Sequence, residues 1–407
     1  MEPAPRRILF VDDERSVLDG LRRLLRPYRK QWTVMVAESG HEGLDKLKEH
    51  PVDVVVSDMR MPKMDGAEFL SHVAAEYPAA IRIVLTGQSS NEAFLRSIGT
   101  THQVLTKPCD PQELVATLER AVSLRARLTS PGLRELVSRI DHLPSLPSLY
   151  LELLEALRKE ASVQDIGGLV AKDLAMSARI LQLVNSAYFG LRNPVADPVQ
   201  ATTFLGVDLI RALTLSAHAF AEMGSAKGSG LNLTALQDHS HAVASLAARM
   251  MKDLECGSTA KDLAYMAGLL HETGRLVLAA SEPEQMAEIM RSVRNESCSL
   301  RDKEFECFGA GHAEVGGYLL GLWALPEDVV EAVTCHHDLE VFIGRSFSVG
   351  GAVYLADRIV SEALPDLSES DSGVVQPTLH EAASALGVQD NLDAWVEFAE
   401  DSQRSAA

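Results

Sequence analysis

A run of apolar, β-branched residues that stops at a carboxylate constrains the fold of this chain more than any other feature. Residues 52–58 are Val-Asp-Val-Val-Val-Ser-Asp, and the chain then turns through Pro62 and an Asp-Gly pair at 65–66. Such a run predicts a strand buried on both faces, as in a parallel sheet. Functional groups of open α/β sheets lie where strands end at their carboxyl edge. The run therefore places Asp58 at a candidate site.

The first 125 residues alternate short apolar runs with stretches of helical periodicity. Strands are expected at 8–11, 33–37, 52–57, 81–85 and 103–106, and helices near 17–25, 43–49, 67–76, 91–98 and from Asp110-Pro111 onward. The alternation predicts an α/β domain with a five-stranded, parallel, doubly wound sheet and right-handed crossovers.

Polar residues follow the expected strands at one edge of this sheet. Asp12 and Asp13 follow the first strand, Asp58 the third, Thr86 the fourth and Lys107 the fifth. Three neighbouring carboxylates repel one another unless a cation lies among them, and Mg²⁺ prefers such oxygen ligands. The same ion would neutralise charge on a phosphoryl group transferred to Asp58, while a hydroxyl and an ammonium suit phosphoryl oxygens. Singly, each residue has an ordinary explanation as a helix cap or a solvated side chain. Together they favour a phosphorylation site.

The segment 6–125 resembles the receiver domain of two-component response regulators. The resemblance lies in Val11–Glu14, Ser57–Gly66, Leu85–Gly87 and Lys107-Pro108, in the expected order. It implies a flavodoxin-like fold and phosphorylation of Asp58 by a histidine kinase or a phosphotransfer protein. It also implies Mg²⁺ ligands at Asp12, Asp13, Asp58 and the Arg60 carbonyl, and phosphate sensing by Thr86 and Lys107. The position three before the lysine is commonly aromatic in this family, and here it is Val104.

The rest of the chain is predicted to be all-α. Residues 126–140 are expected to form a helical linker, 141–340 a helical domain, and 341–407 a helical extension with a flexible acidic joint near 365–373 and a flexible tail. Six of the thirteen histidines lie between 239 and 337. Several of them, with nearby carboxylates, lie at inward-facing helix positions, and helical bundles build divalent metal sites from such side chains. The alternative is a set of buried, hydrogen-bonded histidines without a metal.

This second region resembles the HDOD family, helical output modules related to HD phosphohydrolases and generally regarded as non-catalytic. The resemblance lies in Leu143–Pro147, Leu181–Gly190, Gly268–Gly274 and His312–Gly316. It implies an HD-like bundle with a vestigial metal site, which is matched here by His239, His271, Glu272, His312, His336, His337 and Asp357. Two departures oppose catalysis: Glu272 replaces the Asp of the His-Asp pair, and no Gly-Tyr-Pro element follows His337.

Composition limits the remaining function classes. With 38 Lys and Arg against 57 Asp and Glu, the net charge is −19, which opposes a broad nucleic-acid footprint. The five cysteines form no CxxC pair, and the sequence shows neither a signal peptide nor an apolar run of membrane-spanning length. We therefore expect a cytoplasmic phosphorelay protein that binds Mg²⁺, uses its HDOD domain to contact a downstream signalling protein, and is compatible with a homodimer. The alternative is a phosphorylation-gated, metal-dependent phosphodiesterase of cyclic dinucleotides or other nucleotides, with a second divalent ion in the HDOD domain.

Overall fold

The structure is a computed structural model, and it describes residues 5–87, 100–127, 131–138, 143, 147–191, 193–215, 228–296, 298–363 and 377–404. The chain forms two compact units. The first contains residues 1–141 together with Asn185–Arg192 and Gly321–Ala324, and the second contains the remainder. Each unit is described separately below.

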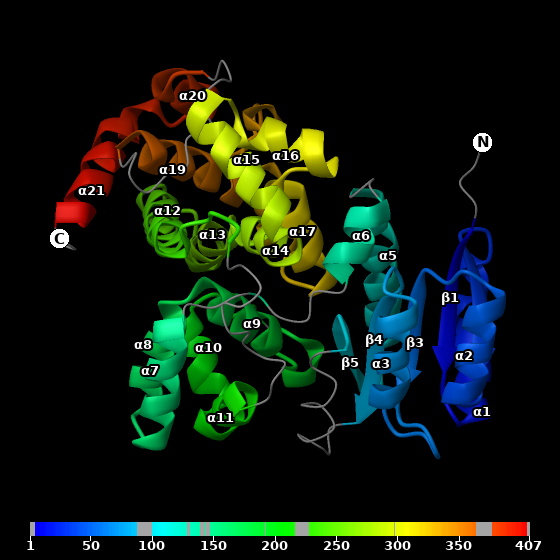
Figure 1. The fold of residues 1–407 in the computed structure, drawn as a ribbon. Helices are drawn as coiled ribbons and strands as arrows, with labels where there is room; N and C mark the ends of the chain where they lie inside the picture. The colour runs from blue at the N-terminus through cyan, green and yellow to red at the C-terminus, as the bar shows by residue number, and fades with distance from the viewer. Residues whose placement is uncertain are drawn as a thin grey trace. The chain divides into compact units, whose positions relative to one another are not determined.

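The first unit is built on a five-stranded parallel sheet with the strand order β2-β1-β3-β4-β5 (Figure 1). Its strands are β1 (Arg6–Val11), β2 (Trp32–Ala37), β3 (Val54–Asp58), β4 (Ile81–Gly87) and β5 (Gln103–Lys107). Its helical elements are α1 (Arg15–Leu25), η1 (Arg26–Tyr28), α2 (Gly40–Glu49), α3 (Gly66–Glu76), α5 (Pro111–Arg127) and α6 (Pro131–Ser138). This order is the doubly wound, flavodoxin-like one, so the predicted fold class is confirmed.

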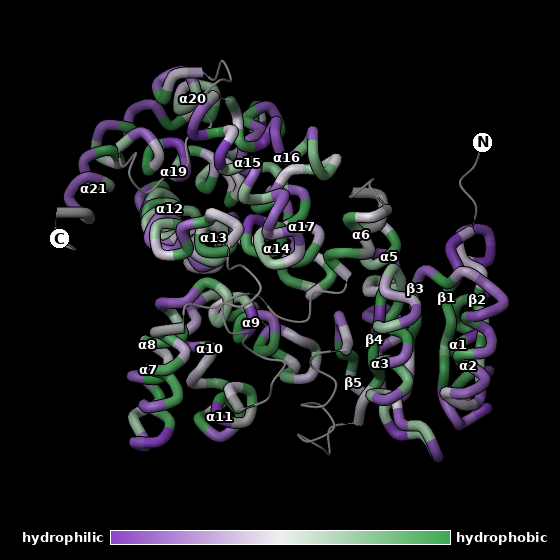
Figure 2. The backbone as a smooth tube through the Cα atoms, in the orientation of Figure 1, coloured by the Kyte–Doolittle hydropathy of each residue, from purple (hydrophilic) through white to green (hydrophobic). Residues whose placement is uncertain are grey.

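The central strand β3 explains why residues 52–58 have their composition. All five residues of β3 are buried, and the strand pairs in parallel with β1 on one side and β4 on the other. The strands β1, β3 and β4 appear as apolar segments in Figure 2, as expected for strands covered on both faces. Asp58 pairs with Leu85 at the carboxyl end of the strand, where the apolar run stops. The sheet therefore presents Asp58 at its edge.

The described residues of the second unit form helices and connecting loops without a strand, as predicted. Of the elements that follow, η2 lies in the first unit and α17 ends in it. The helical elements after α6 are, in chain order, α7 (Pro147–Arg158), α8 (Val163–Ala171), α9 (Leu174–Val184), η2 (Ala187–Phe189), α10 (Pro198–Leu205), α11 (Val207–Leu215), α12 (Leu233–Asp253), α13 (Ser258–Leu270), α14 (Thr273–Ser281), α15 (Pro283–Glu296), α16 (Leu300–Phe308), α17 (His312–Leu322), α18 (Glu327–Cys335), η3 (Leu339–Val341), α19 (Val349–Ala363), α20 (Leu379–Ala385), η4 (Gln389–Asn391) and α21 (Leu392–Arg404).

The core of this unit is the packing of α12 against α13 and α19, with α18 against α13 and α19. The approach of α12 to α13 requires a small residue, because a Cβ on Gly268 would lie 2.7 Å from the Cα of Ala244. Helix α19 lies beyond residue 340, in the segment expected to be an extension, yet it packs into this core and its residues 349–357 are all buried. These four helices, which carry or directly precede every candidate metal residue except His312, thus share one core.

Several sequence predictions can be compared with these elements. Ser162 caps α8 by accepting a hydrogen bond from the amide of Asp165, so this helix begins where a Ser side chain can satisfy a free amide. The helix expected near 91–98 lies outside the described residues, as do the acidic joint at 365–373 and residues 405–407 of the tail. In the described part of the chain, no helix is long and apolar enough to cross a membrane.

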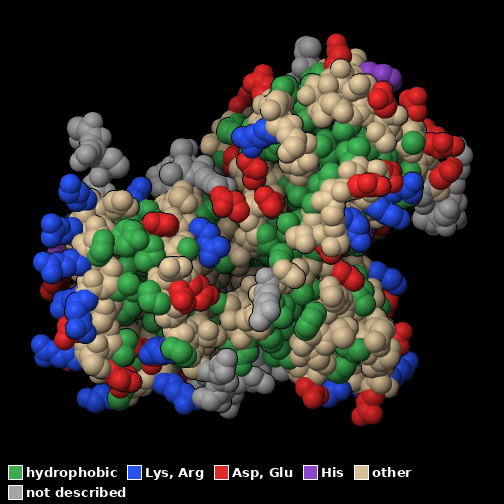
Figure 3. Space-filling model, turned by 180° about the vertical axis from the view of Figure 1, so that it is seen from behind, with side chains coloured by type: hydrophobic (Ala, Val, Ile, Leu, Met, Phe, Trp, Pro, Cys, Tyr) green, Lys and Arg blue, Asp and Glu red, His purple; other side chains and the backbone are tan. Residues whose placement is uncertain are grey.

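Charge is divided unevenly along the chain. Residues 1–141 contain 20 Lys and Arg and 20 Asp and Glu, whereas residues 142–407 contain 18 and 37, so the whole net charge of −19 comes from the second stretch. In the first unit, Lys and Arg side chains gather over one side of its surface, at the left of Figure 3. Six of the basic residues lie in α1, η1 and the turn after them, at Arg15, Arg22, Arg23, Arg26, Arg29 and Lys30.

Candidate functional site

The carboxyl edge of the sheet brings together two carboxylates and one ammonium. Asp12, directly after β1, and Asp58, at the end of β3, are buried, with exposed fractions of 2% and 7%. Lys107, at the end of β5, places its Nζ 2.8 Å from Asp12 Oδ2 and also forms an ion pair with Asp58. Segments separated by 95 residues therefore meet here, as the alternation of strands and helices predicted.

The charges at this edge are incompletely balanced. Burial raises the pKa of Asp58, the hydrogen bond and charge of Lys107 lower it, and the Asp12 carboxylate raises it again, so that the pKa lies above its usual value. Burial lowers the pKa of Lys107, but Asp12 and Asp58 outweigh that effect and raise it. The ammonium therefore remains charged, and two carboxylates share it.

The other predicted residues lie at or just after the ends of the strands β1, β3 and β4. The backbone amide of Arg60 donates to Asp58 Oδ2 at 2.8 Å, which places residue 60 beside the carboxylate. Thr86 is buried at the end of β4, and its hydroxyl donates to the Gly87 carbonyl at 3.2 Å. Asp13 is exposed next to Asp12. Asp12, Asp13 and Asp58 supply the oxygen ligands that Mg²⁺ prefers, so the residues fit this ion.

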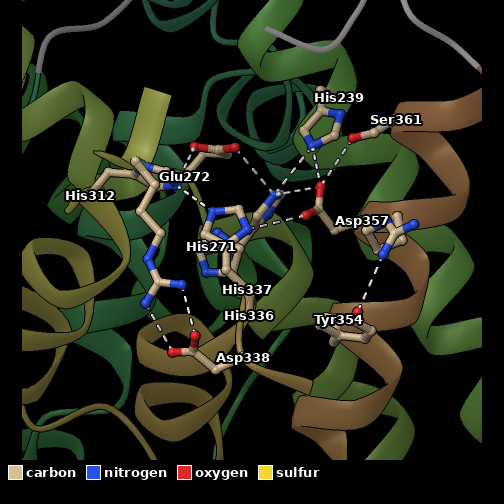
Figure 4. A network of polar contacts seen from close by, with 12 residues as sticks. His239, His271, Glu272, His312, His336, His337, Asp338, Tyr354, Asp357 and Ser361 are labelled. Carbon is tan, nitrogen blue, oxygen red and sulfur yellow. Dashed lines mark hydrogen bonds and ion pairs between the residues drawn. The ribbon is translucent and has the colours of Figure 1, made fainter. Parts of the chain in front are cut away.

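A second constellation lies within the helical unit and contains all seven predicted residues. His239 comes from α12, His271 and Glu272 follow α13, His312 begins α17, His336 and His337 follow α18, and Asp357 lies in α19. Figure 4 shows these side chains pointing toward one another, and all except the partly exposed His337 are buried. We name this set the histidine cluster. It joins residues up to 118 positions apart.

One half of the histidine cluster consists of His239, His271 and Asp357. His239 Nε2 lies 3.0 Å from Asp357 Oδ1 and 3.3 Å from His271 Nε2, while His271 Nε2 lies 3.8 Å from Asp357 Oδ1. One ligand atom from each of the three residues lies within 4.8 Å of the others. We call this half the Asp357 group.

The other half consists of His312, His336 and His337, whose ligand atoms also lie within 4.8 Å of one another. His337 Nε2 lies 2.9 Å from His312 Nε2, and the rings of His336 and His337 are 4.0 Å apart between centroids. We call this half the His312 group. Two imidazole nitrogens at hydrogen-bond distance repel unless one carries a proton or both face a cation.

Hydrogen bonds at the outer nitrogens fix how three of the imidazoles are oriented. Nδ1 of His271 lies 2.7 Å from the Gly268 carbonyl, Nδ1 of His336 lies 2.7 Å from the Val333 carbonyl, and Nδ1 of His312 lies 2.7 Å from Glu304 Oε2. Because a carbonyl or carboxylate oxygen only accepts, each Nδ1 donates, and each Nε2 is directed into the cluster. This arrangement of outer hydrogen bonds is typical of metal-binding histidines.

Burial and neighbouring charges shift the pKa values of the cluster. Burial lowers the pKa of His271 and, with the help of the adjacent His337, lowers that of His336 well below its usual value. Burial raises the pKa of Asp357, but the hydrogen bond and charge of His239 outweigh that effect and hold the pKa well below its usual range. Burial lowers the pKa of His312, but the charge and hydrogen bond of Glu304 outweigh that effect and raise it. Neutral imidazoles and ionised carboxylates are the forms that bind metal, so the shifts of His271, His336 and Asp357 favour metal binding and that of His312 opposes it.

The residues of the cluster fit a divalent transition-metal ion. Among the described residues, Nε2 of His336 is buried and has no hydrogen-bond partner, although it points at the other imidazoles. An unpartnered buried nitrogen requires an explanation such as an ion or a water molecule. Imidazole nitrogens combined with carboxylate oxygens suit zinc, iron or manganese.

Comparison with known families assigns a domain to each part of the chain. Residues 8–119 match the response regulator receiver domain, and residues 143–339 match the HDOD domain. The chain is a response regulator in which a receiver domain precedes an HDOD domain. The acidic edge thus belongs to the receiver domain, and all residues of the histidine cluster except Asp357 lie within the matched HDOD range.

Curated relatives share parts of this architecture. An uncharacterized protein of Treponema pallidum is 29% identical over 207 residues, which is 50% of this chain and 39% of that protein. The uncharacterized transcriptional regulatory protein YesN of Bacillus subtilis is 31% identical over 37% of this chain and 42% of its own length. The chain thus spans about two fifths of the length of these relatives.

Among solved structures, the MmoQ response regulator of Methylococcus capsulatus is 25% identical over 63% of this chain and 98% of that chain, with a TM-score of 0.48. An HDOD domain protein of unknown function from Geobacter sulfurreducens is 24% identical over 70% of this chain and 97% of that chain, with a TM-score of 0.42.

The sequence analysis missed two residues that hold the HDOD cluster in place. Glu304 of α16 is fully buried and accepts hydrogen bonds from the amide and Nδ1 of His312 through Oε2. Arg275 of α14 lies 2.7 Å from Glu272 Oε2 through its Nε. Arg275 stands three residues after Glu272, a spacing that predicts helical contact. Glu304 lies among exposed acidic residues of α16, and no local pattern distinguishes it.

Proposed function

We propose that this chain is a phosphorelay protein whose receiver domain is phosphorylated on Asp58 by a histidine kinase or a phosphotransfer protein. The observation that carries the proposal is the shared contact of Lys107 with Asp12 and Asp58 at the carboxyl edge of the sheet. In the proposed step an Asp58 oxygen attacks phosphorus, an acyl phosphate bond forms, and the phosphorus–nitrogen bond of the donor phosphohistidine breaks. Asp12, Asp13, Asp58 and the Arg60 carbonyl would hold Mg²⁺, which supplies positive charge to the transferring phosphoryl group.

The proposed switch begins at Lys107 and Thr86. Phosphorylation adds oxygen acceptors and negative charge to Asp58, so the Lys107 ammonium gains a stronger partner than the carboxylates it now contacts. The Thr86 hydroxyl, which now donates to a backbone carbonyl, would turn to a phosphoryl oxygen. Val104 is 9% exposed in β5 and offers no ring to reorient, so the response is carried by the backbone and by these two polar residues.

The proposed output is a protein contact made by the HDOD domain rather than a reaction. The matched domain, the replacement of Asp by Glu272 and the absence of a Gly-Tyr-Pro element after His337 support a non-catalytic role. The partner would be a downstream signalling protein in the cytoplasm, and a homodimer is compatible with this role. Direct DNA binding is disfavoured because residues after 141 carry the entire net charge of −19.

Labelling by a small-molecule phosphodonor such as acetyl phosphate tests the proposal. In the presence of Mg²⁺ the full-length chain should acquire one phosphoryl group, detected by intact mass, and Asp58→Asn should acquire none. Asp53→Asn is the matched control, since Asp53 lies beside β3 but away from its carboxyl end. Labelling that persists in Asp58→Asn would end the proposal. Partners that co-purify with the phosphorylated chain, compared with Asp58→Ala, would then identify the output.

A second function is favoured by the inward-directed Nε2 atoms of the histidine cluster. In this proposal the HDOD domain binds a divalent metal and hydrolyses a cyclic dinucleotide or another nucleotide under control of Asp58. A bound ion would supply an activated water for attack on phosphorus. Metal content after purification and turnover against a nucleotide panel test it, with His271→Ala/Glu272→Ala as the variant that should lose both. Turnover lost in that variant would overturn the non-catalytic role.

A further inference from the structure

The carboxylate of Glu272 stands between the two halves of the histidine cluster. Its Oε1 lies 3.6 Å from His271 Nε2, on the side of the Asp357 group. Its Oε2 lies 3.8 Å from His312 Nε2, on the side of the His312 group. One oxygen of this carboxylate is thus placed to bind an ion in each half.

Arg275 occupies one of these two oxygens. Its Nε lies 2.7 Å from Glu272 Oε2, and both side chains are buried, with residue exposures of 6% and 2%. Burial would raise the pKa of Glu272, but Arg275, followed by His312 and His271, lowers it to about 2. A guanidinium is charged at every physiological pH. The positive charge of Arg275 therefore already neutralises the Glu272 carboxylate on the side of the His312 group.

The two halves of the histidine cluster consequently differ in the electrostatic environment that they offer a divalent ion. The Asp357 group contains an ionised carboxylate within 4 Å of two imidazole nitrogens, and Glu272 Oε1 faces it. The His312 group contains three imidazoles. Glu272 Oε2, which Arg275 holds, and Asp357 Oδ2, 4.0 Å from His337 Nδ1, lie beside it, and Glu304 Oε2 contacts it at the outer Nδ1 of His312. An ion there would lie near the guanidinium in a buried, weakly screened region, where like charges repel strongly.

We propose that the HDOD domain binds a single divalent transition-metal ion, in the Asp357 group with Glu272 Oε1, and that Arg275 excludes a second ion from the His312 group. This inference rests on one premise of the second proposed function, namely that the histidine cluster binds metal, and it does not require hydrolysis. Two-metal centres that hydrolyse phosphodiesters use both ions to stabilise the attacking and leaving oxygens. A one-ion cluster lacks metal stabilisation of the leaving oxygen, so Arg275 would disfavour phosphodiester hydrolysis by the metal-bound domain.

Metal stoichiometry of the full-length chain tests this. The protein is stripped with a chelator, reloaded with Zn²⁺ or Mn²⁺, desalted and analysed for bound metal by mass spectrometry, with calorimetric titration as a second measurement. Wild type should bind one ion per chain and Arg275→Met two. Arg291→Met, which removes an exposed arginine of α15, is the matched control and should bind one. Two ions in wild type, or one in a folded Arg275→Met variant, would overturn the role of Arg275.

A second set of variants tests which half of the cluster binds the ion. These variants are informative even if the Arg275→Met variant does not fold. Asp357→Asn should lose the bound ion, whereas His337→Ala, at the partly exposed edge of the His312 group, should retain it. Loss in His337→Ala with retention in Asp357→Asn would overturn the assignment to the Asp357 group. Absence of metal from wild type and from every variant would refute metal binding itself, an outcome distinct from a failure of the Arg275 argument.

Discussion

The acidic edge of the receiver domain and the histidine cluster of the HDOD domain both bury carboxylates beside cationic or basic groups, but they balance charge in opposite ways. At the acidic edge Asp12 and Asp58 share the single ammonium of Lys107, and the pKa of Asp58 is raised. In the cluster, imidazoles and Arg275 surround Asp357 and Glu272, and both carboxylates have lowered pKa values. The acidic edge thus has excess negative charge that favours binding of a further cation. In the histidine cluster, the neighbouring imidazoles and Arg275 already balance most of the carboxylate charge.

The largest expected effect comes from removing the buried anion that holds His312. Glu304→Ala leaves Nδ1 of His312 without its acceptor, and breaking a buried charged pair costs about 3–5 kcal/mol. We expect the HDOD domain to lose this much free energy of unfolding in urea denaturation monitored by circular dichroism. Glu306→Ala on the same helix removes an exposed carboxylate and should change stability by less than about 1 kcal/mol. Equal effects of the two substitutions would contradict the role of Glu304.

The next effect tests how tightly the cluster is packed. A Cβ on Gly274 would lie 1.9 Å from the His312 carbonyl oxygen, so Gly274→Ala must displace the start of α17. Overpacking of this kind costs about 1–3 kcal/mol. Thermal unfolding should show the loss, while Gly168→Ala, where nothing lies within 4 Å, should leave stability unchanged or slightly higher. A neutral Gly274→Ala would mean that α14 and α17 lie further apart than the structure places them.

Replacing one carboxylate in each site should change stability in opposite directions. The pKa of Asp58 is raised by folding, so its ionisation opposes folding at pH 7, and this penalty disappears as the pH falls through the raised pKa. The pKa of Asp357 is lowered, so its ionisation favours folding at pH 7, and this benefit is lost below the ordinary value of 3.8. We expect Asp58→Asn to stabilise β3, and Asp357→Asn to destabilise α12 and α19, each by about 1 kcal/mol.

Amide hydrogen exchange of the full-length chain measures both effects in one sample. The advantage of Asp58→Asn should shrink between pH 7 and pH 4, whereas the deficit of Asp357→Asn should persist over that range. Shifts of the same sign in the two variants would remove the contrast between the sites.

The smallest effect concerns the Lys107 ammonium of the receiver domain. Lys107→Met removes the ammonium that competes with a metal ion for Asp12 and Asp58, so Mg²⁺ affinity should rise roughly three- to tenfold. Calorimetric titration with Mg²⁺ measures this change, and Lys48→Met, at an exposed position of α2, should leave the affinity unaltered. Weaker Mg²⁺ binding in Lys107→Met would show that Lys107 positions the carboxylates rather than competing with the ion.

Local sequence patterns were sufficient for the receiver domain. The run at 52–58 and the alternation around it predicted the parallel sheet, and parallel strands bring their carboxyl ends to one edge whatever the details of packing. Asp12, Asp58, Thr86 and Lys107 therefore meet where their positions after the strands placed them. Their roles in phosphorylation stay predictions that the labelling experiment tests.

In the HDOD domain the sequence indicated that several histidines face inward and, through its motifs, which family the domain resembles. The division of the cluster into two halves, the pairing of Arg275 with one oxygen of Glu272, and the anchoring of His312 by Glu304 were decided only by tertiary structure. The physical reason is that helices pack at angles and distances set by their whole interfaces. Periodicity within one helix fixes the face on which a side chain lies, but not the atom that it meets on another helix.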